Sequence, residues 1–382
     1  MIKRTLKLTM IFILVFNILP NYSDAATFPG DVSARGSILI EQESGRVLFE
    51  KQAHTPMRIA SITKIMTAIL AIESGQLDEW VTVSKNAEGT EGSSLYLVAG
   101  EKIKLRDLVY GLMLRSGNDS AVAIAEHVGG SLEGFVTMMN QKREELGMIN
   151  SAFANPHGLD DHEEHYSTAY DMAILTKYAL ELDEYREIAS TKSYTSKNKA
   201  GSVRSWHNKN RLLTQLYKHS TGGKTGYTKR AKRTLVSTAN KDEMDLIAVT
   251  INAPSDWNDH ISLFEWGFNT FKHSTLVKQG VIEVEDEFYQ EKITAEYSFE
   301  YPLAEEEVEL IDRKVVLYRP PNDDKWERED PPYPIGTIQL ELGEELIGVV
   351  PLKYIGEDEE APPFWKKWLD HLFMVIGVKN SG

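Results

Sequence analysis

The segment Ser61-Ile62-Thr63-Lys64 combines a hydroxyl and an amine at a spacing that suits catalysis. On a helix, residues i and i+3 share one face, so the Lys64 amine can reach the Ser61 hydroxyl. A serine becomes a strong nucleophile only beside a base, and an amine that is desolvated or close to other cations can be that base. A helix N-terminus also offers backbone N–H groups to a developing oxyanion. The alternative is that Ser61 is only a helix N-cap.

A second motif, Ser116-Gly117-Asn118, lies at a break between two predicted helices. We expect Gly117 to permit a tight turn that directs Ser116 and Asn118 into a cleft. Taken alone, the motif is equally typical of a simple helix–helix connector.

A third motif, Gly223-Lys224-Thr225-Gly226, opens a predicted strand. We expect Gly223 and Gly226 to leave room for a peptide that lies antiparallel to the strand. Lys224 supplies positive charge and Thr225 a hydroxyl for a carboxylate. An ordinary glycine-rich turn is the alternative.

The composition narrows the chemistry that these motifs can serve. The 382 residues include no cysteine, which excludes disulfides, thiolate metal sites and a cysteine nucleophile. The net charge of −15 argues against nucleic-acid binding, because phosphate neutralisation requires a basic face. Residues 281–360 hold 24 acidic and 7 basic residues, so the acidity is concentrated in a later module. A solubilising surface explains that acidity better than an acidic binding face.

Periodicity predicts the elements that must position the motifs. An apolar helical pattern starts at about Ser61 and ends near Ser74, and a hairpin is expected over 37–51. Further helices are expected at 105–114, 120–128, 134–146, 169–182 and 256–271, the last with Ser255 as its cap, and strands at 234–239 and 246–251. A linker near 270–280 and short strands at 281–284, 314–318 and 337–342 then predict a small β module.

The two ends of the chain carry targeting patterns. Residues 1–25 have a basic start and a short apolar run, and end in Ser23-Asp24-Ala25, which predicts a signal peptide cleaved after Ala25. A retained N-terminal anchor is the alternative. After Pro362-Pro363, residues 362–378 place aromatic and apolar side chains opposite Lys366 and Lys367, which is typical of an amphipathic helix at a membrane surface. Docking of this helix on the protein itself is the alternative.

Together and in this order, the three motifs resemble those of the penicillin-recognising serine acyl enzymes. Within that group the chain is similar to the low-molecular-mass penicillin-binding proteins, which are serine D-alanyl-D-alanine carboxypeptidases, and most to their sporulation-associated type. The stretches that carry this likeness are Arg58–Lys64, Leu112–Asp119, Asn155–Leu159 and Gly222–Thr228.

The resemblance implies an α/β (α+β) protein with the penicillin-binding/β-lactamase-like transpeptidase fold: an antiparallel sheet flanked by helices, with an all-helical lobe around 75–165. It implies a catalytic domain over 27–275 and a β-rich C-terminal domain over 276–358 that holds the catalytic domain off the membrane. The protein would act outside the cytoplasm, at the outer face of the cytoplasmic membrane or at a forespore membrane.

The resemblance also implies a role for each motif residue. Ser61 would attack the carbonyl between two terminal D-alanines of a peptidoglycan stem peptide, with Lys64 as its base, and no cofactor or metal would be needed. Ser116 and Asn118 would relay a proton to the leaving amine and hold the peptide.

The strand motif would complete the substrate site. Lys224 and Thr225 would meet the terminal carboxylate, and backbone N–H groups of Ser61 and near Tyr227, beside Gly226, would form the oxyanion hole. Removal of D-alanine would limit cross-linking during cell wall or spore cortex maturation, and β-lactam antibiotics would acylate Ser61 as inhibitors.

Some features depart from this pattern or compete with it. Many relatives carry an arginine after the second hairpin strand, where this chain has Ile251–Pro254, and Lys224, Lys229 or Arg230 would have to compensate. The histidines and carboxylates of 157–165 look metal-like, but their spacing is not His-Glu-x-x-His, so we expect a loop beside the cleft. His157 would help to shape that cleft.

Three other activities use the same motifs. A class A-like β-lactamase would need a glutamate that activates water, and Glu163 or Glu164 would be that residue. A β-lactam or muropeptide sensor would be acylated but would hardly turn over. An endopeptidase that cleaves peptide cross-links would apply the same chemistry to a different bond.

Overall fold

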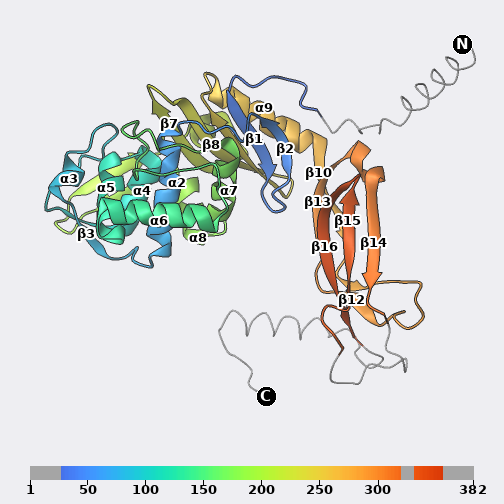
Figure 1. Cartoon of the computed structure of the whole chain (residues 1–382). Helices are drawn as coiled ribbons and strands as arrows, with labels where there is room; N and C mark the ends of the chain where they lie inside the picture. The colour runs from blue at the N-terminus through green and yellow to red at the C-terminus, as the bar shows by residue number, and fades with distance from the viewer. Residues whose placement is uncertain (1–26, 320–330, 356–382) are drawn as a thin grey trace, which may run out of the picture.

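The computed structural model describes residues 27–319 and 331–355, which form a larger body of sheet and helices and a separate β module (Figure 1). The predicted signal peptide and the predicted membrane helix lie outside the described residues. No helix among the described residues is both long and apolar enough to cross a bilayer.

The main sheet of the body has five antiparallel strands in the order β2-β1-β9-β8-β7. Their bounds are β1 Gly36–Glu41, β2 Val47–Lys51, β7 Ser220–Thr228, β8 Lys232–Lys241 and β9 Met244–Ile251. The predicted hairpin and the two predicted strands are confirmed. β1 and β9 are buried along almost their whole length because helices cover both faces of the sheet.

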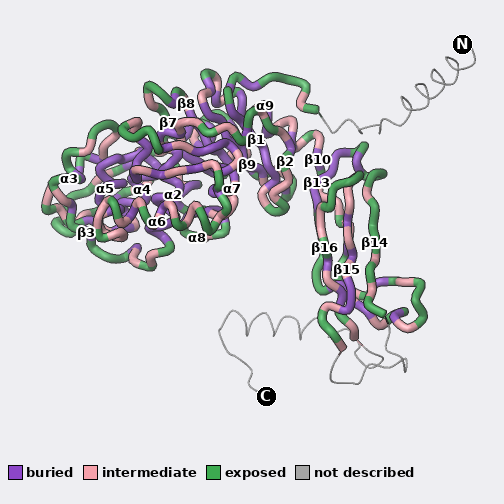
Figure 2. The backbone as a smooth tube through the Cα atoms, in the orientation of Figure 1, coloured by how far each residue is buried: buried purple, intermediate pink, exposed green. Residues whose placement is uncertain are grey.

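Alternate side chains of the sheet enter two different cores. Leu39, Leu235 and Leu246 pack with Phe264 of α9 (Asp256–Thr270) on one face. Ile38, Val236 and Ile247 belong to the larger core on the other face, which the remaining helices share. Figure 2 shows this buried interior running through the body.

The predicted helices occur with somewhat different boundaries: α2 Lys64–Glu73, α4 Leu105–Arg115, α5 Asn118–Gly129, α6 Leu132–Glu145 and α7 Ala169–Ala179, besides α9. Two further helices, α3 (Lys85–Glu88) and α8 (Asp183–Ser190), were not predicted. A 3₁₀ turn, η1 (Ala60–Thr63), precedes α2, and a π turn, η2, covers Leu212–Leu216. Ser255 occupies the N-cap position of α9, as predicted, but its side chain accepts no hydrogen bond from the helix backbone.

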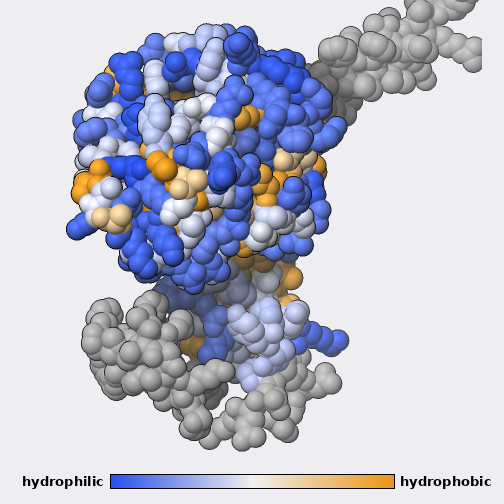
Figure 3. All heavy atoms as spheres, turned by 90° about the vertical axis from the view of Figure 1, so that its left-hand side faces the viewer, coloured by the Kyte–Doolittle hydropathy of each residue, from blue (hydrophilic) through white to orange (hydrophobic). Residues whose placement is uncertain are grey.

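The lobe around 75–165 is not all-helical, which corrects our expectation, because β3 (Trp80–Thr82) pairs with β4 (Lys102–Lys104) inside it. A second ribbon beyond this range, in which β5 (Ser193–Lys197) pairs with β6 (Val203–His207), was not predicted. Such three- to five-residue ribbons carry too few residues for their period to stand out in the sequence. Figure 3 views the molecule from the lobe end and shows a mainly hydrophilic surface with scattered apolar patches.

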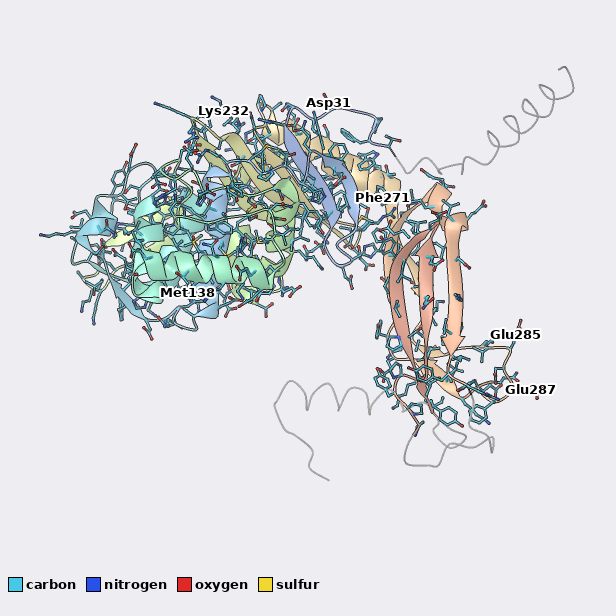
Figure 4. The ribbon with its side chains drawn as sticks, in the orientation of Figure 1. Asp31, Met138, Lys232, Phe271, Glu285 and Glu287 are labelled. Carbon is cyan, nitrogen blue, oxygen red and sulfur yellow. The ribbon has the colours of Figure 1, made fainter. Side chains whose placement is uncertain are left out.

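The linker predicted near 270–280 is wrong, because β10 (Phe271–Val277) follows α9 directly and pairs with β13 (Phe299–Ala304). Beyond it lies a second sheet in the order β11-β12-β16-β15-β14. Its strands are β11 Gly280–Val281, β12 Ile293–Ala295, β14 Ile311–Leu317, β15 Gly336–Leu342 and β16 Glu345–Tyr354, with a 3₁₀ turn, η3, over Glu305–Leu310. Figure 4 places Phe271 where the two bodies meet, with Glu285 and Glu287 toward the opposite end of the module.

One buried ion pair joins the two bodies. Arg46, in the β1–β2 turn, donates to both carboxylate oxygens of Glu307 at 2.5 and 2.9 Å and also to the Pro302 carbonyl. Its guanidinium lies 5.2 Å from the ring centre of Phe271 and 5.1 Å from that of Tyr301. The arginine is thus compensated by charge, by hydrogen bonds and by two aromatic faces.

Candidate active site

Ser61 lies in the η1 turn that leads into α2, whereas we predicted it at the N-terminus of the helix itself. The turn is strained: Ala60 has φ +48°, a left-handed conformation that costs free energy for a residue with a Cβ atom. Gly158 packs against it so closely that an added Cβ atom would lie 1.9 Å from the Ala60 carbonyl oxygen. The half-buried Ser61 hydroxyl is 3.1 Å from the Lys64 Nζ atom.

Lys64 is fully buried and is surrounded by neutral oxygen atoms. Its Nζ atom lies 2.7 Å from the Asn118 Oδ1 atom and 2.6 Å from the His157 carbonyl oxygen. Burial, and then the nearby charge of Lys224, hold the pKa of Lys64 well below its usual range. A neutral amine has two N–H groups, which can donate to these two carbonyl oxygens and leave the lone pair for the Ser61 hydroxyl.

Ser116 and Asn118 lie at the α4–α5 junction and face the two buried lysines. Ser116 adopts the left-handed conformation at φ 63°, whereas Gly117 has φ −59°, so our expectation that Gly117 makes the turn is wrong. The glycine is needed for space instead, since a Cβ atom there would lie 2.6 Å from Leu95. The Asn118 amide nitrogen also donates to the Glu91 carbonyl at 2.6 Å, which fixes the side chain's orientation.

The third motif lies on β7, the edge strand of the main sheet, and Lys224 points into the site. Its fully buried Nζ atom donates to the Ser116 hydroxyl at 3.0 Å. Burial, and then the charge of Lys209, lower the pKa of Lys224 to about 7. Thr225 and Gly226 follow half-buried, and Tyr227 is exposed.

The two glycines of this motif serve the protein's own packing. An added Cβ atom at Gly226 would lie 2.9 Å from the Ser61 nitrogen, and one at Gly223 would lie 2.1 Å from the Val236 carbonyl oxygen. β7 is an edge strand, so room for an antiparallel peptide along its free edge stays a prediction. Glycine lets β7 approach the Ser61 backbone closely.

The loop over 155–165 borders the site, as expected. The His157 carbonyl contacts Lys64, and the His157 ring nitrogen Nδ1 accepts from the Leu159 N–H at 3.2 Å. Burial, and then the charge of Lys64, lower the pKa of His157 to about 3. Within the part of the chain that the structure describes, no three His, Asp or Glu side chains are grouped to hold a metal ion.

Glu163 in this loop is held by two arginines. Arg230 donates to both of its oxygens at 2.7 and 2.9 Å, and Arg58 donates at 2.6 Å. These contacts, that with Arg230 first, lower the pKa of the exposed Glu163 to about 2. A carboxylate in this state is a poor base for water. Arg230 is also committed to this contact, which disfavours our expectation that it compensates for the missing arginine.

The motifs did not point to two residues beside the site, Asp119 and Lys209. Asp119 is fully buried and accepts from the Ser94 hydroxyl at 2.6 Å and the Leu95 N–H at 2.8 Å, so it ties the 94–97 segment to α5. Lys209 donates to the Ser93 hydroxyl at 3.3 Å, and its charge contributes to the low pKa of both site lysines. Asp119 adjoins the second motif and could have been suspected, but no local pattern distinguishes Lys209.

Comparisons with known proteins agree with this geometry. Residues 23–255 match the peptidase S11 family, described as D-alanyl-D-alanine carboxypeptidase. The chain is 37% identical to the D-alanyl-D-alanine carboxypeptidase DacF of Bacillus subtilis over 64% of this chain, but the match spans only 65% of DacF, just under two thirds.

Longer matches also occur. The chain is 32% identical to the D-alanyl-D-alanine carboxypeptidase DacD of Salmonella typhimurium, over 86% of this chain and 88% of that protein. The structure of penicillin binding protein 5 from Haemophilus influenzae superposes with a TM-score of 0.71 at 25% identity, covering 86% of this chain and 98% of the other.

Proposed function

Because the chain belongs to the peptidase S11 family of D-alanyl-D-alanine carboxypeptidases, we propose that it removes the terminal D-alanine from peptidoglycan stem peptides through an acyl-enzyme on Ser61. The observation that carries this proposal is the buried Lys64 amine, which lies 3.1 Å from the Ser61 hydroxyl and has a lowered pKa. A base at this position removes the main obstacle to a serine nucleophile.

In the proposed acylation, the Ser61 oxygen attacks the penultimate D-alanine carbonyl while Lys64 takes the hydroxyl proton. The peptide C–N bond then breaks, and the proton passes by way of Ser116 and Asn118 to the leaving D-alanine amine. Protonated Lys224, beside Ser116, with Thr225 would hold the terminal carboxylate. The Ser61 N–H and one near Tyr227, beside Gly226, would stabilise the oxyanion, and water would release the shortened peptide.

Penicillins would acylate Ser61 in the same way and inhibit the enzyme. We further propose that the protein acts outside the cytoplasm, held at a membrane surface by the C-terminal amphipathic segment, and that it contributes to cell wall or spore cortex maturation. The export pattern of residues 1–25 and the pattern of residues 362–378 support this placement.

The β-lactamase alternative finds little support, because Glu163 is exposed and is held by two guanidinium groups. The sensor alternative differs only in turnover. We would therefore measure D-alanine release from a diacylated peptide ending in D-Ala-D-Ala, with the wild type and Ser61→Ala in parallel. Release by the wild type alone supports the proposal. Penicillin acylation without D-alanine release would support the sensor, and equal release by both proteins would exclude Ser61 as the nucleophile.

A further inference from the structure

A continuous chain of hydrogen bonds joins the loop that contains His165 to η1, the turn that carries Ser61. The Ala154 N–H donates to the His165 Nδ1 atom at 3.0 Å, and the His165 Nε2 atom lies 2.8 Å from the Thr63 Oγ1 atom. The Thr63 hydroxyl in turn donates to the Ala60 carbonyl at 2.8 Å. The loop over 154–165, which is distant in sequence, is thus connected through Thr63 to the residue that precedes Ser61.

The direction of this chain follows from its first donor. Because a backbone N–H can only donate, the His165 Nδ1 atom accepts, and the ring proton must lie on Nε2. Nε2–H then donates to Thr63, whose own proton is left for the Ala60 carbonyl. Burial, and then the nearby charge of Arg58, lower the pKa of His165 to about 3, so the ring is neutral and the chain keeps this direction at neutral pH.

The acceptor at the end of the chain belongs to the peptide unit that carries the Ser61 N–H. A trans peptide is planar, and its C=O and N–H point in opposite directions, so a bond that fixes the Ala60 oxygen also fixes the direction of the Ser61 N–H. The strained φ of Ala60 makes such support necessary. The preceding carbonyl, that of Ile59, is held in a similar way by the Thr234 hydroxyl at 2.9 Å.

We propose that His165 and Thr63 are positioning residues for oxyanion stabilisation: their hydrogen-bond chain orients the Ala60–Ser61 peptide and polarises its N–H toward the substrate carbonyl. Successive hydrogen bonds polarise one another, so donation into the Ala60 carbonyl strengthens the Ser61 N–H as a donor. This inference rests on the proposed function, because it requires an acyl group on Ser61.

The test follows the acyl carbonyl itself. Wild type, His165→Leu, His165→Gln, Thr63→Val and Thr63→Ser would be acylated with benzylpenicillin carrying ¹³C at the β-lactam carbonyl, and the ester stretch would be recorded by infrared difference spectroscopy. A weaker oxyanion donor leaves the carbonyl less polarised, so His165→Leu and Thr63→Val should shift the band to higher frequency. Acylation by these two variants should slow about tenfold, less than for complete loss of an oxyanion donor.

The conservative variants should recover the wild-type band. Serine retains the hydroxyl at position 63, and the glutamine amide can donate from the position of Nε2. Thr63→Val replaces the hydroxyl by a methyl group of similar volume, so this variant should fold. The test therefore stays decisive even if His165→Leu does not fold.

A matched control comes from His260, which is also fully buried, has a pKa lowered by burial to about 3, and contacts the Ser237 and Thr250 hydroxyls. In β8 and β9, successive side chains point to opposite faces of the sheet, and the neighbours of Ser237 and Thr250 belong to the core on the α2 face. Both hydroxyls, and His260 with them, therefore lie on the α9 side of the sheet. His260→Leu should lower stability and leave the band in place.

An unshifted band in both His165→Leu and Thr63→Val would overturn the inference, as would an equal shift in His260→Leu. If the wild type formed no acyl-enzyme on Ser61 at all, the proposed function would fail first, and the inference with it.

Discussion

Cations in the active site and at the joint between the two bodies are surrounded by different kinds of group. At the joint, Arg46 meets a carboxylate, a carbonyl and two aromatic rings. In the site, Lys64 and Lys224 are more deeply buried than Arg46, yet their nitrogen atoms contact neutral oxygens, and neither forms a salt bridge within residues 27–319 and 331–355. A compensated charge stabilises a structure, whereas an uncompensated one lowers its own pKa and becomes available for proton transfer.

The largest expected effect is on Lys64. Lys64→Met removes the base but keeps the bulk of the side chain, and acylation by penicillin should slow about 10³-fold or more. Lys142→Met is the control, because Lys142 is paired with Glu73 and Glu145 and its pKa is raised. Stopped-flow acylation should leave the control at the wild-type rate; equal losses in both variants would remove Lys64 from the mechanism.

Loss of the Glu307 carboxylate at the joint should destabilise the protein. Glu307→Gln leaves the Arg46 charge buried and uncompensated, which should cost about 3 kcal/mol of unfolding free energy. Hydrogen exchange of β10 and β13 amides would locate the loss, while D-alanine release should remain unchanged. Glu300→Gln, which alters a half-exposed carboxylate of the same module, is the control. Equal unfolding free energies of Glu307→Gln and Glu300→Gln would contradict the view that the carboxylate compensates the Arg46 charge.

Removing an uncompensated cation should raise the free energy of unfolding, whereas Glu307→Gln should lower it. Lys224→Met should abolish peptide turnover yet raise the unfolding free energy at pH 6 by about 1–2 kcal/mol. The folded pKa of about 7 lies below the unfolded 10.5, so between these values the unfolded chain binds more protons and wild-type stability rises with pH. The advantage of the variant should therefore be largest below pH 7 and should shrink above it. Urea unfolding at pH 6 and pH 9 would show this, and a destabilised variant at pH 6 would refute it.

The smallest expected effect concerns the exposed Glu163. Solvent screens its contacts with Arg58 and Arg230, so Glu163→Gln should change deacylation by less than about threefold. Recovery of D-alanine release after a penicillin pulse would measure this. Loss of deacylation in the variant would instead revive the β-lactamase alternative.

The sequence predicted the parts of this molecule that depend on local pattern. The helical periodicity before Gly75 and the three motifs were sufficient to place Lys64 on a helix, Ser116 at a break between helices and Lys224 on a strand, whereas Ser61 lies in the turn just before its predicted helix. The left-handed Ser116 was not predictable, because Gly117 is the residue that usually takes such a conformation and only packing against Leu95 explains the choice.

Long-range contacts account for the other misses. Arg46 and Glu307 are 261 residues apart, and nothing near either residue indicates its partner. His165 was assigned only to a loop beside the cleft, and its contacts with Thr63 and Ala154 come together only in the fold. The β10 strand was taken for a linker because its pairing partner, β13, lies beyond two other strands.

The most direct test of the division of roles between the two buried lysines is the pH dependence of Ser61 acylation by a substrate that carries a carboxylate. Acylation requires neutral Lys64 and protonated Lys224, so the rate should rise as Lys64 loses its proton and fall above about pH 7 as Lys224 does. Lys224→Arg keeps a cation there at every accessible pH, and the alkaline fall should disappear. An alkaline fall at the same pH in both proteins would contradict the assignment.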